Sequence, residues 1–139
     1  MFRAASTTIG VVMTQTTSAR DGNTANFSKA VRAGDLVFVS GQASVNDNGQ
    51  IVSGTFADEM HRSIENVRDI LTDFDLDLTD VVKVSAYVQN PDDVGEFNRL
   101  YRSFFSHPLP ARTTITNCLT DAIKFEIDVV AYAGTSHVV

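Results

Sequence analysis

The sequence is poor in cysteine and has no long apolar run. Its single cysteine, Cys118, cannot form a disulfide within the chain, which excludes a disulfide-framed secreted scaffold and favours a reducing cytoplasm. No segment approaches the roughly 18 consecutive apolar residues that span a bilayer, so no membrane partner is expected. The sequence also lacks a P-loop, a dinucleotide-binding glycine motif, CxxC and HExxH. The strong signatures of nucleotide, redox and metalloprotease sites are therefore absent.

The composition is that of an acidic globular protein. The 139 residues are 43% hydrophobic and carry 11 Lys and Arg against 17 Asp and Glu, a net charge of −6. This length predicts one domain with its own core, because domains cluster at about 100–150 residues. An acidic surface repels phosphate backbones, so nucleic acid is not an expected partner.

The first 12 residues do not fit a targeting signal. The apolar stretch from Ile9 to Met13 is shorter than the core of a signal peptide, which has about 7–15 residues. We expect residues 1–12 to be either a disordered extension or an over-long start, with Met13 an equally good beginning. The predicted domain then covers residues 13–139.

Apolar runs and alternation predict six strands separated by polar turns. The expected ranges are 11–17, 27–33, 36–40, 82–88, 113–117 and 123–132. The third is a continuous apolar run, typical of a strand that is buried on both faces. Gly41 follows this run and predicts a bulge, or a place where another group closely approaches the backbone.

Two capping patterns predict the helix starts. Thr55 and Asp58 form the first pattern, and Asp93 and Glu96 repeat it. Apolar residues then recur at helical spacing, so they share one face of each helix. They are Met60, Ile64, Val67 and Leu71 in the first helix, and Phe97, Leu100, Tyr101 and Phe104 in the second.

The resulting order is β-β-β-α-β-α-β-β, which predicts an α+β domain with both helices on one face of a single mixed sheet. No remaining element of the chain can cover the other sheet face. A homo-oligomer that packs sheet against sheet is the simplest solution.

Two segments near strand ends carry candidate binding groups. Arg112 follows a proline-stiffened loop, where it can hold a substrate carboxylate or form a structural ion pair. Ser40-Gly41-Gln42 ends an apolar strand, where it can line a pocket or simply form a polar turn. The residues alone leave both alternatives open.

The last strand carries the candidate general base. Lys124, Glu126 and Asp128 alternate on one predicted face with apolar residues beyond them. A carboxylate there can sit in a partly dry site with a raised pKa, or it can lie on a solvated or ion-paired strand face.

No metal site or nucleophile is expected. The three histidines, His61, His107 and His137, lie far apart without the spacing of metal ligands. Cys118 has no evident neighbouring base, so a small buried hydrophobe is the simpler interpretation.

Seven segments stand out by their order and spacing. They are Phe27-Ser28-Lys29-Ala30-Val31, Ser40-Gly41-Gln42, Glu65-Asn66, Asp80-Val81-Val82-Lys83, Phe97-Asn98-Arg99-Leu100-Tyr101, Pro110-Ala111-Arg112-Thr113-Thr114 and Phe125-Glu126-Ile127-Asp128. Together they resemble the RidA (YjgF/YER057c/UK114) family. The resemblance implies a chorismate-mutase-like fold, a homotrimer with pockets at the subunit interfaces, and hydrolysis of reactive 2-imino acids to 2-keto acids and ammonia. It implies no metal or organic cofactor.

The resemblance also implies roles for individual residues. Arg112 matches the family's carboxylate-binding arginine, and Glu126 matches the acidic residue that positions or activates water. Ser40 matches a pocket serine beside the exposed backbone of Gly41. Asn98 matches a recurrent helix position without a clear role.

Two positions depart from the family pattern. Phe27 stands where the deaminases usually carry tyrosine, so one pocket hydroxyl is missing. Thr114 stands where many members carry cysteine, so no thiol chemistry is expected there. Backbone N–H groups near Thr114 are still expected to bind the substrate.

An imine deaminase is the expected function. The first alternative is a non-catalytic binding protein or regulator that keeps the arginine but activates water poorly, which the loss of the Phe27 hydroxyl favours. The second is an endoribonuclease, a label often attached to the family. A net charge of 3 × −6 = −18 per trimer opposes RNA binding.

Overall fold

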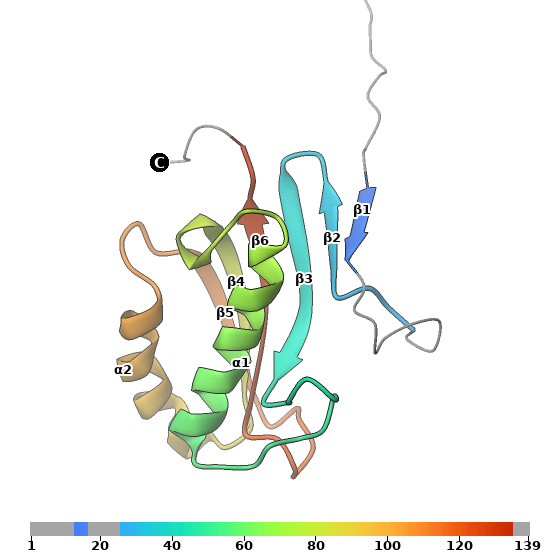
Figure 1. Ribbon diagram of the computed structural model, residues 1–139. Helices are drawn as coiled ribbons and strands as arrows, with labels where there is room; N and C mark the ends of the chain where they lie inside the picture. The colour runs from blue at the N-terminus through green and yellow to red at the C-terminus, as the bar shows by residue number, and fades with distance from the viewer. Residues whose placement is uncertain (1–12, 17–25, 135–139) are drawn as a thin grey trace, which may run out of the picture.

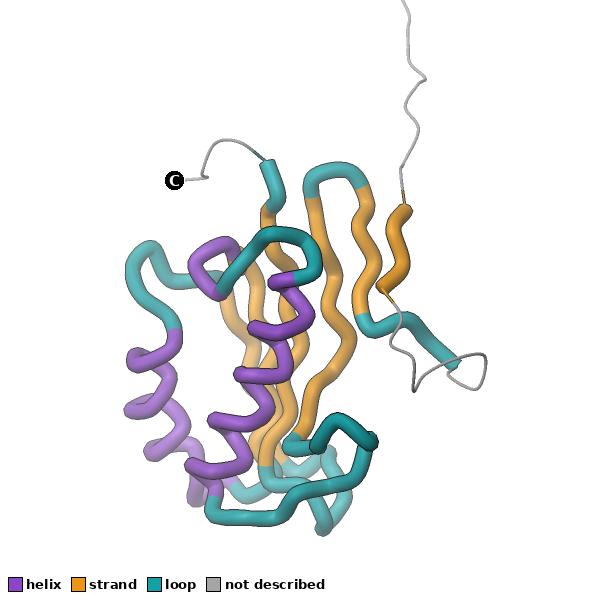
Figure 2. Tube along the Cα trace, viewed as in Figure 1, coloured by secondary structure: helices purple, strands orange, loops and turns teal. Residues whose placement is uncertain are grey.

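The computed structural model describes residues 13–16 and 26–134 (Figure 1). Two helices lie against one face of a six-stranded mixed sheet, as Figures 1 and 2 show, which confirms the predicted α+β class and element order. The strands are β1 (Met13–Thr16), β2 (Ala30–Ala33), β3 (Leu36–Ala43), β4 (Val81–Val88), β5 (Ala111–Thr116) and β6 (Phe125–Tyr132). The helices are α1 (Phe56–Thr72) and α2 (Val94–Phe104), with short 3-10 turns at Leu78–Asp80 and Pro91–Asp93.

The predicted N-terminal extension, residues 1–12, lies outside the described residues. So do the outer ends of the first predicted strand, of which the structure describes Met13–Thr16. In the described part of the chain, neither helix is long and apolar enough to cross a membrane.

The strand order places β6 at the centre of the sheet and β5 at one edge. The order is β1-β2-β3-β6-β4-β5, in which β4 and β5 run parallel and the other neighbours run antiparallel. A parallel pair needs a crossover connection, which here contains α2. The crossover therefore places α2 beside the edge strand that carries Arg112.

We call the sheet face that α1 and α2 cover the inner face, and the other the open face. The helix stripes predicted from the sequence pack on the inner face, where Met60, Ile64, Val67, Leu71 and Phe97 are fully buried. The strands alternate accordingly. In β6, for example, Phe125, Ile127, Val129 and Ala131 point inward, while Glu126, Asp128, Val130 and Tyr132 point to the open face.

Both helices start directly after the predicted cap residue, but only the first has the predicted capping box. Asp58 N donates to Thr55 Oγ1 at 3.1 Å, and Thr55 N donates to Asp58 Oδ2 at 3.2 Å. Asp93 makes no side-chain cap, because its backbone is already helical after the 3-10 turn. The cap lies upstream instead, where Asn90 Oδ1 accepts from Asp92 N at 2.9 Å.

The prediction that the apolar strand is buried on both faces is wrong for the single chain. Val37 and Val39 are buried on the inner face, whereas Leu36 and Phe38 are 37% and 44% exposed. The reason is that no described element covers the open face. The predicted bulge at Gly41 is confirmed, since the β3–β6 register shifts between Val39 and Gln42.

Candidate functional site

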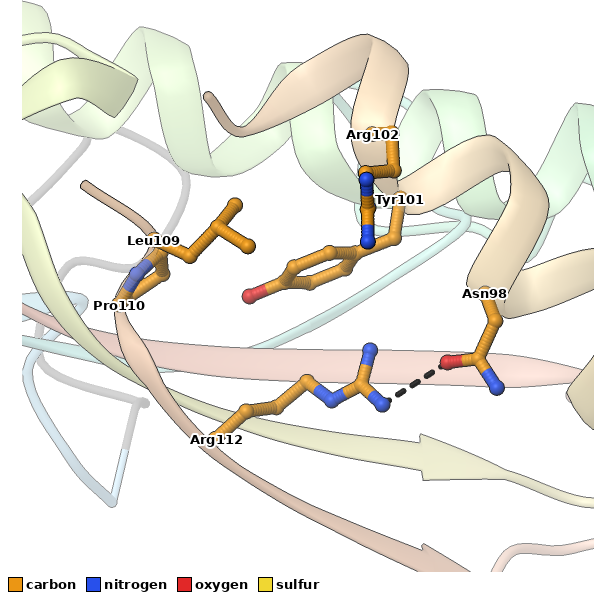
Figure 3. A pocket seen from close by; sticks show the side chains of 6 residues that line it. All are labelled: Asn98, Tyr101, Arg102, Leu109, Pro110 and Arg112. Carbon is orange, nitrogen blue, oxygen red and sulfur yellow. Dashed lines mark hydrogen bonds between the residues drawn. The ribbon is translucent and has the colours of Figure 1, made fainter. Parts of the chain in front are cut away.

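A cavity of about 250 Å³ lies between α2 and the edge strand β5 (Figure 3). Its lining residues are Asn98, Tyr101, Arg102, Leu109, Pro110 and Arg112. The parallel register pairs Arg112 with the buried Val84, so the Arg112 side chain leaves β5 on the inner face, toward α2. The crossover connection therefore brings the predicted arginine and the predicted Asn98 together.

The guanidinium of Arg112 is held in place by three groups of α2. Arg112 Nη2 donates to Asn98 Oδ1 at 2.8 Å. The guanidinium carbon lies 4.8 Å from the ring centroid of Phe97 and 4.7 Å from that of Tyr101. These cation–π contacts and the hydrogen bond orient the planar group and leave most of its N–H donors unused.

Arg112 is not part of a structural ion pair in the described part of the chain. The ion pairs there join Arg32 to Asp35, Arg68 to Glu65, Arg99 to Glu96 and Lys124 to Glu59. An oriented guanidinium without a carboxylate partner, at the wall of a cavity, can accept a substrate carboxylate through two parallel hydrogen bonds.

Two buried hydroxyl groups near Arg112 lack a hydrogen-bond partner among the described residues. They belong to Tyr101 and Thr114. Thr114 pairs with the buried Ala86, so its side chain lies on the same face as Arg112, two residues along β5. Burial raises the pKa of Tyr101 to about 12, although the Arg112 charge acts in the opposite direction. The Tyr101 hydroxyl therefore stays protonated at neutral pH and can donate a hydrogen bond.

Glu126 lies on the open face of the central strand, away from this cavity. Burial raises the pKa of Glu126, and the negative charge of Asp128 raises it further. Asp128 is itself held by Tyr87 Oη, which donates to Asp128 Oδ2 at 2.8 Å. A carboxylate with a raised pKa is a better general base near neutral pH, so the structure favours the first of the two interpretations that the sequence leaves open for this position.

Gly41 makes room for the Glu126 carboxylate. A Cβ at position 41 would overlap Glu126 Oε2, whereas glycine leaves that space free. The close approach predicted at Gly41 is therefore an approach by the candidate base.

The remaining predicted residues lie beside this strand bulge. Ser40 Oγ donates to Ser28 O at 2.6 Å, and Ser40 N donates to Lys29 O at 2.9 Å. These bonds attach the segment before β2 to the bulge. Phe27, in that segment, is 71% exposed and lies outside the strand, which begins only at Ala30.

Lys124 does not share the face of Glu126 and Asp128, contrary to prediction. It lies before the start of β6, and its Nζ pairs at 3.2 Å with Glu59 of α1 on the inner side of the sheet. The buried carboxylate of Glu59 draws the lysine there, because an unpaired buried charge is costly.

The predicted residues thus form two groups on opposite faces of the sheet. Arg112, Asn98 and Thr114 lie on the inner face at the β5 edge. Glu126 and Gly41 lie on the open face. Along β4, Glu126 is paired with Tyr87, whereas Arg112 is paired with Val84, three residues earlier. One chain therefore does not bring Arg112 and Glu126 around the same small molecule.

Several lining residues were not singled out from the sequence as parts of a site. Tyr101 belongs to the predicted apolar stripe and to one of the seven segments that resemble the family, but neither gives it a role in the site. Arg102 and Leu109 have no predicted role. Tyr87 was seen only as part of an alternating strand. The signal for Tyr101 is its spacing of three from Asn98, which places both on one side of a helix.

Comparisons with known proteins identify the family of this chain. The sequence profile of the family described as Endoribonuclease L-PSP matches residues 17–133. The 2-iminobutanoate/2-iminopropanoate deaminase of Rattus norvegicus is 32% identical over 110 residues, covering 78% of this chain and 80% of the rat protein. A RutC family protein of Pyrococcus abyssi is 32% identical over 108 residues, covering 76% of this chain and 85% of that protein.

The fold agrees as well. The crystal structure of RidA from an Antarctic Psychrobacter matches with a TM-score of 0.70 and 26% identity, over 78% of this chain and 89% of that chain. The profile match spans most of the chain, and it includes both groups of candidate site residues. The chain therefore belongs to the RidA (YjgF/YER057c/UK114) family, whose profile is described as Endoribonuclease L-PSP.

Proposed function

We propose that this protein hydrolyses reactive 2-imino and enamino acids to 2-keto acids and ammonia. The observation that carries the proposal is the Arg112 guanidinium, which is oriented by Asn98 and two aromatic rings and has no carboxylate partner among the described residues. Relatives named 2-iminobutanoate/2-iminopropanoate deaminase, about one-third identical to this chain, support the same reaction class.

The reaction needs a positioned anion and an activated water. Arg112 binds the substrate carboxylate and thereby holds the C=N carbon close to the water, a positioning effect. Glu126 takes a proton from the water while the water oxygen adds to the imine carbon. The same carboxyl group then returns a proton to the amine as the C–N bond breaks, leaving a 2-keto acid and ammonia. Backbone N–H groups near Thr114 stabilise the oxygens of the substrate. The Ser40 hydroxyl donates its one proton to Ser28 O, so it can only accept a hydrogen bond from the substrate.

The complete site requires a second copy of the chain under this proposal. Arg112 and Glu126 lie on opposite faces of one sheet, so a neighbouring chain supplies one of them. Leu36, Phe38 and Ile115 expose apolar surface that another copy can cover. We therefore propose a homotrimer with sites between subunits, and size-exclusion chromatography with light scattering that finds only monomer would overturn it.

A coupled assay tests the activity. Added to a threonine dehydratase reaction, the wild-type protein is expected to speed the appearance of 2-ketobutyrate. Arg112→Ala is expected to lower this effect about 100-fold or more, because a charge-assisted bidentate contact is lost. Arg99→Ala is the matched control, since Arg99 is exposed on α2 and does not line the cavity. No acceleration by the wild type would remove the proposal.

A non-catalytic carboxylate-binding protein is the second candidate. Phe27 favours it, because a phenyl ring cannot donate the hydrogen bond that a tyrosine would supply there. Calorimetry separates the two: binding of 2-ketobutyrate without turnover of the imine supports the binder. The proposed ligand in both cases is a small acid, in the cytoplasm, rather than a nucleic acid or a membrane.

A further inference from the structure

Two arginines, not one, line the cavity between α2 and β5. Arg112 comes from the edge strand and Arg102 from the last turn of the helix. In the view of Figure 3 they lie on either side of the Tyr101 side chain. The sequence resemblance assigns no role to Arg102, and the deaminase mechanism above does not use it.

Arg102 shares with Arg112 the lack of a carboxylate partner in the described part of the chain. Arg32, Arg68 and Arg99 each pair with a carboxylate three residues away. Arg62 also forms no ion pair among the described residues, but it does not line the cavity. A ligand with two negative groups can pair with both guanidinium groups of the cavity, whereas a ligand with one negative group can pair with only one of them.

The rest of the cavity suits the chain between two acid groups. Leu109 and Pro110 form an apolar wall, and the buried Tyr101 hydroxyl is a donor without a partner. The volume of about 250 Å³ lies just below the about 300–1,000 Å³ of pockets for drug-sized ligands, so it fits a smaller molecule. A short aliphatic diacid has these properties.

We propose that the cavity selects 2-imino dicarboxylates, with Arg112 binding the α-carboxylate and Arg102 binding the side-chain carboxylate. The inference rests on the proposed deaminase function and names its substrate class. Water adds to the imine carbon and the C–N bond breaks as above, so the products are a 2-keto dicarboxylate and ammonia. A reaction that dehydrogenates an acidic amino acid must supply such a substrate.

Imines made in place by amino-acid oxidases test the proposal. The wild type is expected to have a higher kcat/KM for the imines of glutamate and aspartate than for 2-iminobutanoate. Arg102→Gln is expected to lower kcat/KM for the dicarboxylic imines about threefold to fivefold, the upper range for an exposed charge pair. The value for 2-iminobutanoate is expected to stay within about twofold.

Two further variants make the result specific. Arg102→Lys keeps the positive charge and is expected to retain most of the preference for diacids. Arg62→Gln removes the same charge from an exposed position on α1 outside the cavity, and it is expected to leave the preference unchanged. An equal effect of Arg102→Gln on both substrate classes would overturn the inference.

A binding measurement separates failure of this inference from failure of the proposed function. Calorimetry with 2-oxoglutarate and 2-ketobutyrate needs no turnover. Tighter binding of 2-oxoglutarate that is lost in Arg102→Gln supports the second subsite even if no imine is hydrolysed. Equal binding of the two keto acids contradicts the second subsite even if 2-iminobutanoate is hydrolysed.

Discussion

Gly41 has no side chain, and this leaves room for the carboxylate of Glu126. The Glu126 carboxylate occupies space that a Cβ at position 41 would fill. The candidate base can therefore keep this position against the bulged strand only while residue 41 has no side chain.

Gly41→Ala is accordingly expected to displace the Glu126 carboxylate and to lower imine hydrolysis by at least about tenfold, because a positioned base contributes about 10²–10⁴-fold. Gly95→Ala is the control, since a Cβ at Gly95 in α2 meets no atom within 4 Å. The control is expected to keep full activity and to gain stability. Unchanged activity in Gly41→Ala would contradict the assigned role of Glu126.

Asp128 is the charged neighbour that raises the pKa of Glu126, after burial. A raised pKa leaves more of the base protonated below neutral pH, so it sets the acid limb of the rate profile. Asp128→Asn removes the charge, lowers the pKa of Glu126 toward its ordinary value, and is expected to move the acid limb to lower pH. The measurement is kcat/KM against pH for both proteins.

Tyr87 of β4 acts on the same profile through Asp128, because its hydroxyl donates a hydrogen bond to the Asp128 carboxylate. Tyr87→Phe keeps both charges and removes only the hydrogen bond. It is expected to shift the acid limb less than Asp128→Asn does, and a larger shift would assign the effect to the phenol instead.

The residue types of the candidate site could be predicted from the sequence, but their contacts could not. The sequence predicts Arg112 as a candidate carboxylate-binding residue and Glu126 as a candidate base. It also predicts that another group approaches the backbone closely at Gly41. The hydrogen bond from Arg112 to Asn98 joins residues on different elements, so no local pattern contains it. The same holds for the bond between Tyr87 and Asp128.

At the scale of elements, Glu59 connects the start of α1 to the start of β6. Its side chain is almost completely buried and accepts from Gly54 N at 3.2 Å, Lys124 N at 3.0 Å and Lys124 Nζ at 3.2 Å. The carboxylate thus satisfies two backbone donors that local secondary structure leaves free.

Glu59→Gln is expected to lower the free energy of unfolding by about 1–3 kcal/mol, because charge-assisted hydrogen bonds become neutral ones and one donor loses its acceptor. Denaturant titration measures this change. Lys124→Met is the companion variant. It is expected to lower the free energy of unfolding at least as much as Glu59→Gln, because it leaves the buried carboxylate without its cation. A smaller decrease would show that the backbone donors matter more than the ammonium.

Element types and most boundaries followed from local patterns. The capping box at Thr55 and the apolar stripes were predicted because they involve residues within a few positions of each other. The second helix starts after Asp93 as predicted, but it lacks the predicted capping bonds, because a proline-led 3-10 turn precedes it and Asn90 caps that turn. The third strand has the apolar pattern of a fully buried strand, but this chain alone covers only one face.

At the scale of the whole molecule, the proposed site needs two chains, because Arg112 and Glu126 lie on opposite faces of one sheet. In the proposed trimer, each site takes Arg112 from one subunit and Glu126 from its neighbour. Arg112→Ala and Glu126→Gln homotrimers are each expected to be nearly inactive. Refolded together in equal amounts, the two variants are expected to regain about one quarter of wild-type activity. At each site, about half of the subunits supply an intact Arg112 and about half of their neighbours supply an intact Glu126.

The same mixture refutes the proposal if activity does not return. When one chain supplies both residues, every subunit in the mixture lacks one of them, and no complete site can form. A mixture of wild type with the double variant controls for refolding. It distinguishes loss of assembly from loss of complementation.

The acidic composition, the order of strands and helices, and the residues able to bind a carboxylate or activate water can all be seen in the chain itself. They depend on residue chemistry and on spacings of two to four positions. Which face each side chain reaches depends on strand register, on the bulge at Gly41 and on the crossover that sets α2 beside β5. These are contacts between residues far apart in the chain, and they separate Arg112 from Glu126 and bring Arg102 to the Arg112 cavity.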